Sequence, residues 1–247
     1  MEVQRDQIIG ELVAQDYRCA SVFKKYGIDF CCQGNRTIND ACIAKEMDVA
    51  VVLNDLNSIS KASRTAGGID FQSWPLDLLA DYIEKTHHRY VEAKTPELTA
   101  YLDRITEVHG NTHPELYKIK ELFQLVVGNL AQHMKKEELI LFPFIRKMEK
   151  AKLTGQPLEK PHFGSIKNPI DAMEDEHLAE GDRLRDINVL SNNYTPPEDA
   201  CNTYRVTFGM LKEFEEDLHL HIHLENNILF PQSIVLEKQL RDYAEIS

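Results

Sequence analysis

Two segments of the chain repeat one short pattern of residues that could bind a metal ion. Residues 132–143 read QHMKKEELILFP, and residues 219–231 read HLHIHLENNILFP. In each, a histidine precedes a glutamate by four residues, and Ile-Leu-Phe-Pro follows. On a helix, residues four apart lie on one face. Imidazole and carboxylate together suit iron, manganese or zinc, so each segment predicts part of a metal site.

Helical periodicity separates the three histidines of the second segment. At about 100° per residue, His221 and Glu225 fall within about 60° of the apolar stripe through Leu218, whereas His219 and His223 lie about 100° or more away. We therefore expect His221 and Glu225 to face the core. His219 and His223 are expected on the flank of the helix, with no part in the site.

The same test places His133 and Glu137 on the apolar stripe of the upstream helix, and His177 on that of a third helix. His133 and His221 lie 88 residues apart, and His88 and His177 lie 89 apart. A lone inward histidine is more often an ordinary core residue. Two copies of one motif, with inward histidines on other helices, instead predict a metal site in the core of a helical bundle.

Two carboxylates on opposing helices could each bridge two ions, with histidines as terminal ligands. Two octahedral irons offer about twelve coordination positions, and two bridging glutamates, four histidines and an oxo bridge would fill about ten. About two positions would then remain for small molecules. The ligand count is therefore compatible with an oxo- and carboxylate-bridged pair of metal ions per chain.

The elements that would position these residues are nearly all helical. Four long periodic segments, joined by loops rich in Gly, Pro and Asn, predict an all-α, up-down four-helix bundle; they span about 76–94, 114–150, 168–190 and 198–230. We expect a small helical domain over 1–62, a linker over 63–74 that contains a Gly-Gly pair, and the bundle over 75–247. In the small domain, Gly27 is expected to end a helix, and Thr37 and Asp48 to cap the next two.

Charge and composition exclude several classes of partner. The net charge is −12 and the pI is about 5.3, which argues against binding nucleic acid because phosphates require clustered Lys and Arg. No apolar run approaches the roughly 20 residues that span a membrane, and the first residues do not resemble a signal peptide. We expect a cytoplasmic protein without a membrane partner.

The five cysteines are odd in number, which favours reduced thiols over a disulfide framework. Cys31 and Cys32 are adjacent and are expected in a tight turn, where thiols could bind iron, exchange disulfides or dimerise the chain. Cys19, Cys42 and Cys201 are expected to pack in the core.

The motifs together resemble a known family. The two His-x-x-x-Glu helices ending in ILFP, with THHRY, EDEH and VHGNTHPEL, look like hemerythrin-like di-iron domains. The N-terminal YGIDFCCQGNRTI resembles the short domain that precedes this bundle in bacterial iron-sulfur cluster repair proteins, the repair of iron centres family. The resemblance covers nearly the whole chain.

The resemblance implies a cytoplasmic non-haem di-iron protein that helps to restore iron-sulfur clusters damaged by nitric oxide or oxidative stress. Its ligands would be two bridging glutamates and four histidines, namely Glu137, Glu225, His88, His133, His177 and His221. The family pattern selects His88 from the His87-His88 pair, but periodicity favours His87, which lies about 40° from Ile83 whereas His88 lies about 140° away. His87 therefore remains an alternative ligand. His109 also matches the family and is a further candidate.

Several functions remain open at this stage. Iron donation to damaged iron-sulfur proteins, assisted by the cysteine domain, is the first hypothesis. The alternatives are a module that binds or senses oxygen or nitric oxide, a nitric oxide or peroxide reductase, and a metal-free helical interaction protein. The sequence also leaves a homodimer open.

Overall fold

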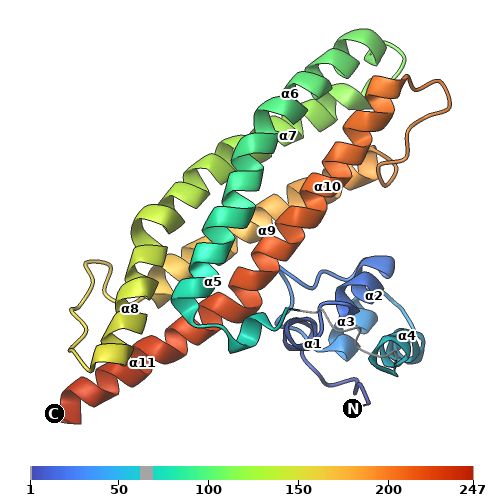
Figure 1. Ribbon diagram of the computed structural model, residues 1–247. Helices are drawn as coiled ribbons and strands as arrows, with labels where there is room; N and C mark the ends of the chain where they lie inside the picture. Colours follow the sequence, from blue (N-terminus) through green and yellow to red (C-terminus); the bar gives the residue numbers. More distant parts are fainter. Residues whose placement is uncertain (1, 62–68, 247) are drawn as a thin grey trace.

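Figure 1 shows the chain as a long helical bundle with a smaller helical unit beside it. This computed structural model describes residues 2–61 and 69–246, so half of the expected linker over 63–74 lies outside the described residues. Within the described ranges there is no strand; one isolated bridge pairs Ile8 with Thr37. The predicted all-α four-helix bundle is confirmed.

The smaller unit contains four short helices: α1 Ile9–Gln15, α2 Cys19–Lys25, α3 Ile38–Ala44 and α4 Val49–Lys61. Its predicted helix ends are confirmed. Gly27 adopts a left-handed φ of 60° two residues after α2, a conformation that favours glycine. Thr37 Oγ1 accepts a hydrogen bond from the Asp40 amide at the start of α3, and Asp48 accepts one from Ala50 at the start of α4.

The bundle consists of four long rods. Three are interrupted by a wider π-helical turn, and a short 3₁₀ turn, η1 Phe71–Ser73, precedes the first. The rods in chain order are α5 Leu76–Tyr82, η2 Ile83–His88 and α6 Arg89–His109; α7 Glu115–Lys136, η3 Glu137–Leu141 and α8 Phe142–Thr154; α9 Lys167–Leu190; and α10 Asn202–Leu224, η4 Glu225–Leu229 and α11 Phe230–Ile246.

The first and fourth rods are longer than the sequence predicts. The first continues through Pro96 to His109, although a proline removes one helical hydrogen bond. Burial of Leu98, Leu102 and Ile105 beyond it offsets that loss.

The Ile-Leu-Phe-Pro sequences explain two of the π turns. Pro143 and Pro231 each lie two residues after such a turn, and the carbonyl four residues before each proline lies within it. A proline has no N–H for that carbonyl, and its ring would clash with the carbonyl in a regular helix. A widened turn at this point therefore accommodates the proline.

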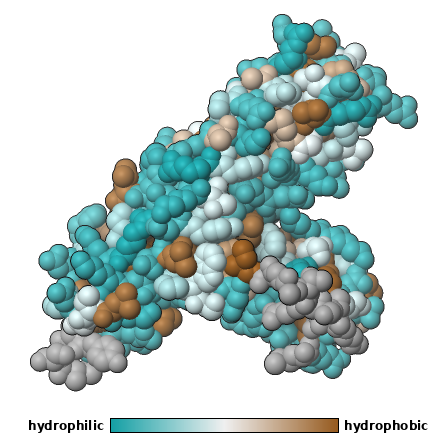
Figure 2. Space-filling model, viewed as in Figure 1, coloured by the Kyte–Doolittle hydropathy of each residue, from teal (hydrophilic) through white to brown (hydrophobic). Residues whose placement is uncertain are grey.

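The apolar core is divided along the bundle axis. One cluster of buried side chains includes Leu130, Met134 and Leu218 and extends into the smaller unit; the other includes Ile83, Phe142 and Ile228. Figure 2 shows a largely hydrophilic outer face, with the smaller unit as a separate lobe against the bundle. No helix among the described residues combines the length and hydrophobicity needed to cross a membrane.

Candidate metal centre

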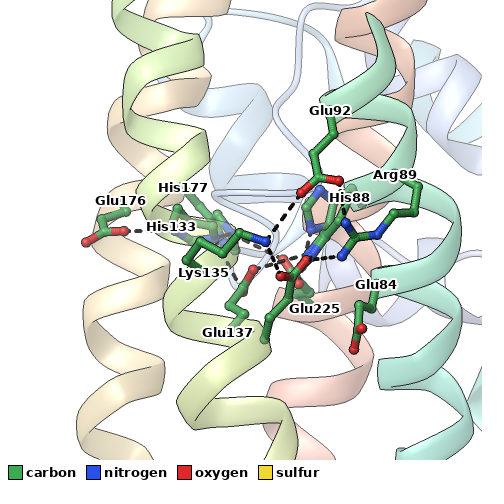
Figure 3. Close-up of polar contacts among 12 residues, drawn as sticks. Glu84, His88, Arg89, Glu92, His133, Lys135, Glu137, Glu176, His177 and Glu225 are labelled. Atoms are coloured by element: carbon green, nitrogen blue, oxygen red, sulfur yellow. Dashed lines mark hydrogen bonds and ion pairs between the residues drawn. The ribbon is translucent and has the colours of Figure 1, made fainter. Parts of the chain in front are cut away.

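Six ionisable side chains from the four rods converge at the boundary between the two apolar clusters. They form two groups that share both carboxylates: a first group of His88, Glu137, His221 and Glu225, and a second group of His133, Glu137, His177 and Glu225. Figure 3 shows His133 and His177 on one side of the site and His88 on the other. All six are buried, none more than 3% exposed.

Each carboxylate reaches both groups with a different oxygen. Glu137 Oε2 lies 3.4 Å from His88 Nε2, and its Oε1 lies 3.3 Å from His133 Nε2. Glu225 Oε1 lies 3.1 Å from His221 Nε2, and its Oε2 lies 3.2 Å from His177 Nε2. The centre therefore has approximate two-fold symmetry, and each glutamate places one oxygen in each group.

The outer nitrogens of three histidines are held by polar partners. Nδ1 of His88 lies 3.1 Å from Glu138, Nδ1 of His133 lies 2.8 Å from Glu176, and Nδ1 of His177 lies 2.8 Å from Asn226. Such contacts fix a ring and its tautomer, and leave Nε2 free to bind a metal. Nε2 of His133 and Nε2 of His177 are 3.0 Å apart, close enough for one ring to donate a hydrogen bond to the other when no metal is bound.

Burial and charge oppose each other at the centre. Burial raises the pKa of Glu225, but the nearby His221 and His177 lower it by a larger amount. The net pKa of Glu225 therefore falls well below its ordinary range. Burial lowers the pKa of His133, but Glu137 and Glu176 raise it to about 10. For His221, burial prevails and the pKa falls. The glutamates are thus held as carboxylates, the form that binds metal.

The donor set fits a metal better than it fits an empty core. Among the described residues, neither oxygen of Glu137 or Glu225 accepts a hydrogen bond. Nε2 of His88 and both ring nitrogens of His221 also lack a hydrogen-bond partner there. Leaving buried polar groups unpaired is costly. Nitrogen and carboxylate donors suit iron, manganese or zinc, so these residues form a candidate metal site.

A network of charged side chains lies beside His88. Glu138, which contacts His88, is held by Arg89 Nη2 and Lys135 Nζ, each at 2.6 Å. Partial burial raises the pKa of Glu138, but these two cations and His88 together lower it by a larger amount, so the net pKa falls. The arrangement keeps a negative oxygen on the outer nitrogen of His88.

The structure places His88, not His87, in the first group. Both lie in the π turn η2, where the i+5 residue, rather than i+4, returns above residue i. His88, five residues after the buried Ile83, therefore faces the core. His87 is also buried, but its Nδ1 lies 3.0 Å from Asp217 and it belongs to neither group. The periodicity that favoured His87 assumed a regular α-helix.

The structure separates His109 from both groups. His109 is the last residue of α6, 21 residues along the helix from His88, which corresponds to about 30 Å. Its Nε2 lies 3.2 Å from the sulfur of Cys201. Cys201 is exposed at the start of α10, so the expectation that it packs in the core is wrong. Cys19 and Cys42 are buried as expected.

The Cys31–Cys32 turn packs directly against the metal-binding helices. Cys32 Sγ lies 3.4 Å from the backbone oxygen of His177. Asn226, which holds the ring of His177, also donates from Nδ2 to the backbone oxygen of Cys31 at 3.2 Å. Asn227 donates in the same way to Phe30 at 3.2 Å.

Sequence reasoning missed both asparagines because polar residues after a motif resemble solvent-exposed residues. The only signal available was that two adjacent asparagines directly follow Glu225 in an otherwise apolar segment.

His219 and His223 lie outside both groups, as the periodicity predicts. His219 is half-buried and His223 is buried. His223 is 2% exposed and packs beside Tyr17 and Phe30, and the ring of His219 also contacts Phe30. These two histidines therefore form part of the contact between the bundle and the smaller unit.

Comparison with known proteins agrees with this architecture. The model of the hemerythrin HHE cation binding domain matches residues 80–233, and that of the ScdA_N domain, a domain of unknown function, matches residues 5–60.

Similar curated proteins cover nearly the whole chain. Iron-sulfur cluster repair protein ScdA of Staphylococcus haemolyticus is 30% identical over 92% of this chain and 98% of its own. Iron-sulfur cluster repair protein YtfE of Musicola paradisiaca is 32% identical over 93% of this chain and 97% of its own. Iron-sulfur cluster repair protein YtfE of Escherichia coli O8 is 33% identical over 94% of this chain and 99% of its own. The chain thus belongs to the hemerythrin HHE family, and within it to the iron-sulfur cluster repair proteins that carry an N-terminal ScdA_N domain.

Proposed function

We propose that this chain holds two iron ions between Glu137 and Glu225 and donates iron to iron-sulfur clusters damaged by nitric oxide or oxidative stress. The observation that carries the proposal is the shared carboxylate pair: each of the two groups contains two histidines and one oxygen from each glutamate. The similarity to proteins named for cluster repair, over more than nine-tenths of the chain, supports the same function.

The residues have distinct roles in this proposal. Glu137 and Glu225 bind both ions, and the histidines bind one ion each: His88 and His221 in the first group, His133 and His177 in the second. Bound iron would supply the exchangeable metal that rebuilding a cluster requires. A carboxylate that contacts two ions can keep one when the other leaves, so the shared glutamates suit stepwise release.

The proposed partners are damaged iron-sulfur proteins, and the proposed location is the cytoplasm. Every one of the five cysteines is unpaired in the structure, as expected in a reducing compartment.

Iron analysis and iron transfer test the proposal together. The purified chain should contain about two irons, and its ⁵⁷Fe should appear in a cluster-depleted acceptor enzyme whose activity returns. The control is the same amount of free ferrous iron. If the loaded protein restores no more activity than free iron does, donation is wrong.

A second candidate function is reversible binding of oxygen or nitric oxide. Deep burial of all six side chains favours it, because a buried centre exchanges ions slowly but admits small gases. A stable oxygenated spectrum with unchanged iron content, and no transfer to the acceptor, would favour this function over donation.

A further inference from the structure

The turn that joins α2 to α3 brings two thiols and a carboxylate together outside the dinuclear centre. We propose that Asp29, Cys31 and Cys32 form a second, mononuclear site for a thiophilic divalent ion such as Fe²⁺ or Zn²⁺. One ligand atom from each residue lies within 4.8 Å of the others. Soft thiolate ligands select such ions over Mg²⁺ or Ca²⁺.

Two of the three distances between these atoms match those around a tetrahedral ion, and the third, between Cys32 Sγ and the Asp29 carboxylate, is within 4.8 Å. Cys31 Sγ lies 3.7 Å from Cys32 Sγ and 3.5 Å from Asp29 Oδ1. With metal–sulfur bonds of about 2.3 Å and a metal–oxygen bond of about 2.1 Å, tetrahedral geometry separates two sulfurs by about 3.8 Å, and a sulfur from an oxygen by about 3.6 Å. An ion could therefore bind with only small movements of these side chains.

The turn is held in this shape by its surroundings. Asp29 Oδ1 accepts hydrogen bonds from the amides of Cys31 at 3.1 Å and Cys32 at 2.9 Å. Asn226 holds the backbone oxygen of Cys31 from the other side. Without a metal, a hydrogen bond with Cys32 and burial raise the pKa of Cys31 well above its ordinary value, so metal binding would release protons.

Solvent reaches the site through a pocket of about 620 Å³ between the smaller unit and the bundle. Cys32 is only half-buried there. Besides Asp29, the pocket wall carries five cationic residues (Lys24, Lys25, Lys45, Arg185 and Lys212) and two acidic residues (Glu215 and Glu216). Two thiolates and a carboxylate carry more negative charge than one divalent ion neutralises, and these cations offset the excess. Three protein ligands leave one coordination position for water or for a ligand of a recipient.

The site lies against the helix that supplies His177. Cys32 Sγ is 3.4 Å from the backbone oxygen of His177. One helical turn later, a Cβ at Gly181 would approach Cys32 Sγ to 3.1 Å, so glycine lets the turn lie close to α9. If the chain donates iron, as proposed above, the second site holds an ion between the dinuclear centre and the recipient. That transit role rests on the proposed function, whereas the binding itself does not.

Cadmium titration of the reduced, metal-free, full-length chain tests the site. Thiolate-to-cadmium charge-transfer absorption appears only when sulfur binds, so the nitrogen and oxygen ligands of the dinuclear centre do not contribute. We expect one equivalent of thiolate-bound cadmium, lost in both C31S and C32S. Asp29→Asn keeps a side-chain oxygen that can accept the hydrogen bonds of the turn but loses the negative charge. It should weaken cadmium binding about tenfold. The matched control, C201S, removes an exposed cysteine and should leave the titration unchanged.

Three results would overturn the site: no charge-transfer absorption in the reduced wild type, absorption that persists in C31S and C32S, or absorption lost in C201S. Circular dichroism and the iron content of the dinuclear centre show whether each variant has folded. The ⁵⁷Fe assay separates this site from the proposed function. Cadmium binding without any iron transfer retains the site and rejects donation, whereas undiminished transfer by folded C31S and C32S rejects the transit role.

Discussion

The amide oxygen of Asn226 lies 2.8 Å from Nδ1 of His177, so the orientation of a metal-binding ring depends on a residue that also contacts the N-terminal unit. The same side chain donates to Cys31 through its nitrogen. Docking of the smaller unit and geometry of the dinuclear centre are therefore linked through one side chain.

Replacing Asn226 should separate these two roles. Asn226→Ala loses both contacts and should weaken metal binding about 10- to 100-fold, the usual effect of removing a partner of a ligating histidine. It should also speed hydrogen exchange over residues 29–33. Asn226→Asp keeps the oxygen that faces His177, so metal affinity should persist while exchange still rises. Equal metal loss in both variants would contradict this division.

Glutamate variants test the sharing of carboxylates. Glu137→Gln and Glu225→Gln should each lower iron content from about two per chain to below one, because each removes a charged ligand from both groups. Glu121→Gln, an exposed glutamate on the same rod as Glu137 that belongs to neither group, should retain the iron. Loss of only one ion in either of the first two variants would mean that the carboxylate serves a single group. Iron quantification on folded protein decides between these results.

The π turn in the first rod predicts unequal roles for the adjacent histidines. His88→Ala should lose iron, and His87→Ala should keep it, because only His88 approaches Glu137. The pair forms its own matched control, since both side chains are buried. Iron analysis and the absorption spectrum of each variant provide the measurement. Greater loss in the His87 variant would mean that this turn is a regular helix.

A similar contrast is expected around the fourth rod. His221→Ala should lose metal, whereas His223→Ala should keep it but lower the free energy of unfolding by about 1–3 kcal/mol. The cause is the loss of a buried ring that packs against Tyr17 and Phe30 and meets Asn227 at 3.0 Å. Urea denaturation together with iron analysis distinguishes a structural histidine from a ligand. Iron loss in the His223 variant would show that docking itself supports the centre.

Gly10 offers a second test of docking. A Cβ there would lie 2.0 Å from Asn227 Oδ1, and the Nδ2 of the same side chain is held by hydrogen bonds to the backbone oxygen of Phe30 and to Nδ1 of His223. Gly10→Ala should destabilise the fold by about 1–3 kcal/mol through overpacking. Gly128→Ala is the control: nothing lies within 4 Å of its Cβ, and alanine should stabilise that helix by about 0.5–1 kcal/mol. Equal midpoints for the two variants in urea would contradict this contact.

The bundle and the inward direction of five of the six side chains could be predicted because both depend on the periodicity of single helices; His88 could be expected only from the family resemblance. Repetition of His-x-x-x-Glu on two rods marked Glu137 and Glu225 without any knowledge of their partners. The choice between His87 and His88 could not be made from phase, because phase assumes a constant rotation per residue and η2 interrupts it. No proline marks that turn, unlike the turns before Pro143 and Pro231.

Helical periodicity could not predict the contact between the bundle and the smaller unit. His219 and His223 lie away from the stripe through Leu218, and a single helix offers no sign that another unit covers that face. Asn226 and Asn227 also serve this contact, because they donate hydrogen bonds to the backbone of a segment about 195 residues earlier in the chain. Such long-range contacts leave little trace in local sequence.

The three π turns also have a consequence for how such a centre could arise. Each holds one residue more than an α-helix needs for the same turn, so each rod resembles a regular helix into which a single residue has been inserted. Deleting one residue from such a turn would restore an unbroken hydrogen-bond ladder. It would also rotate everything beyond the deletion by about 100° relative to the preceding helix. A rod made regular by such a deletion could no longer bring its ligands together with those of the other rods.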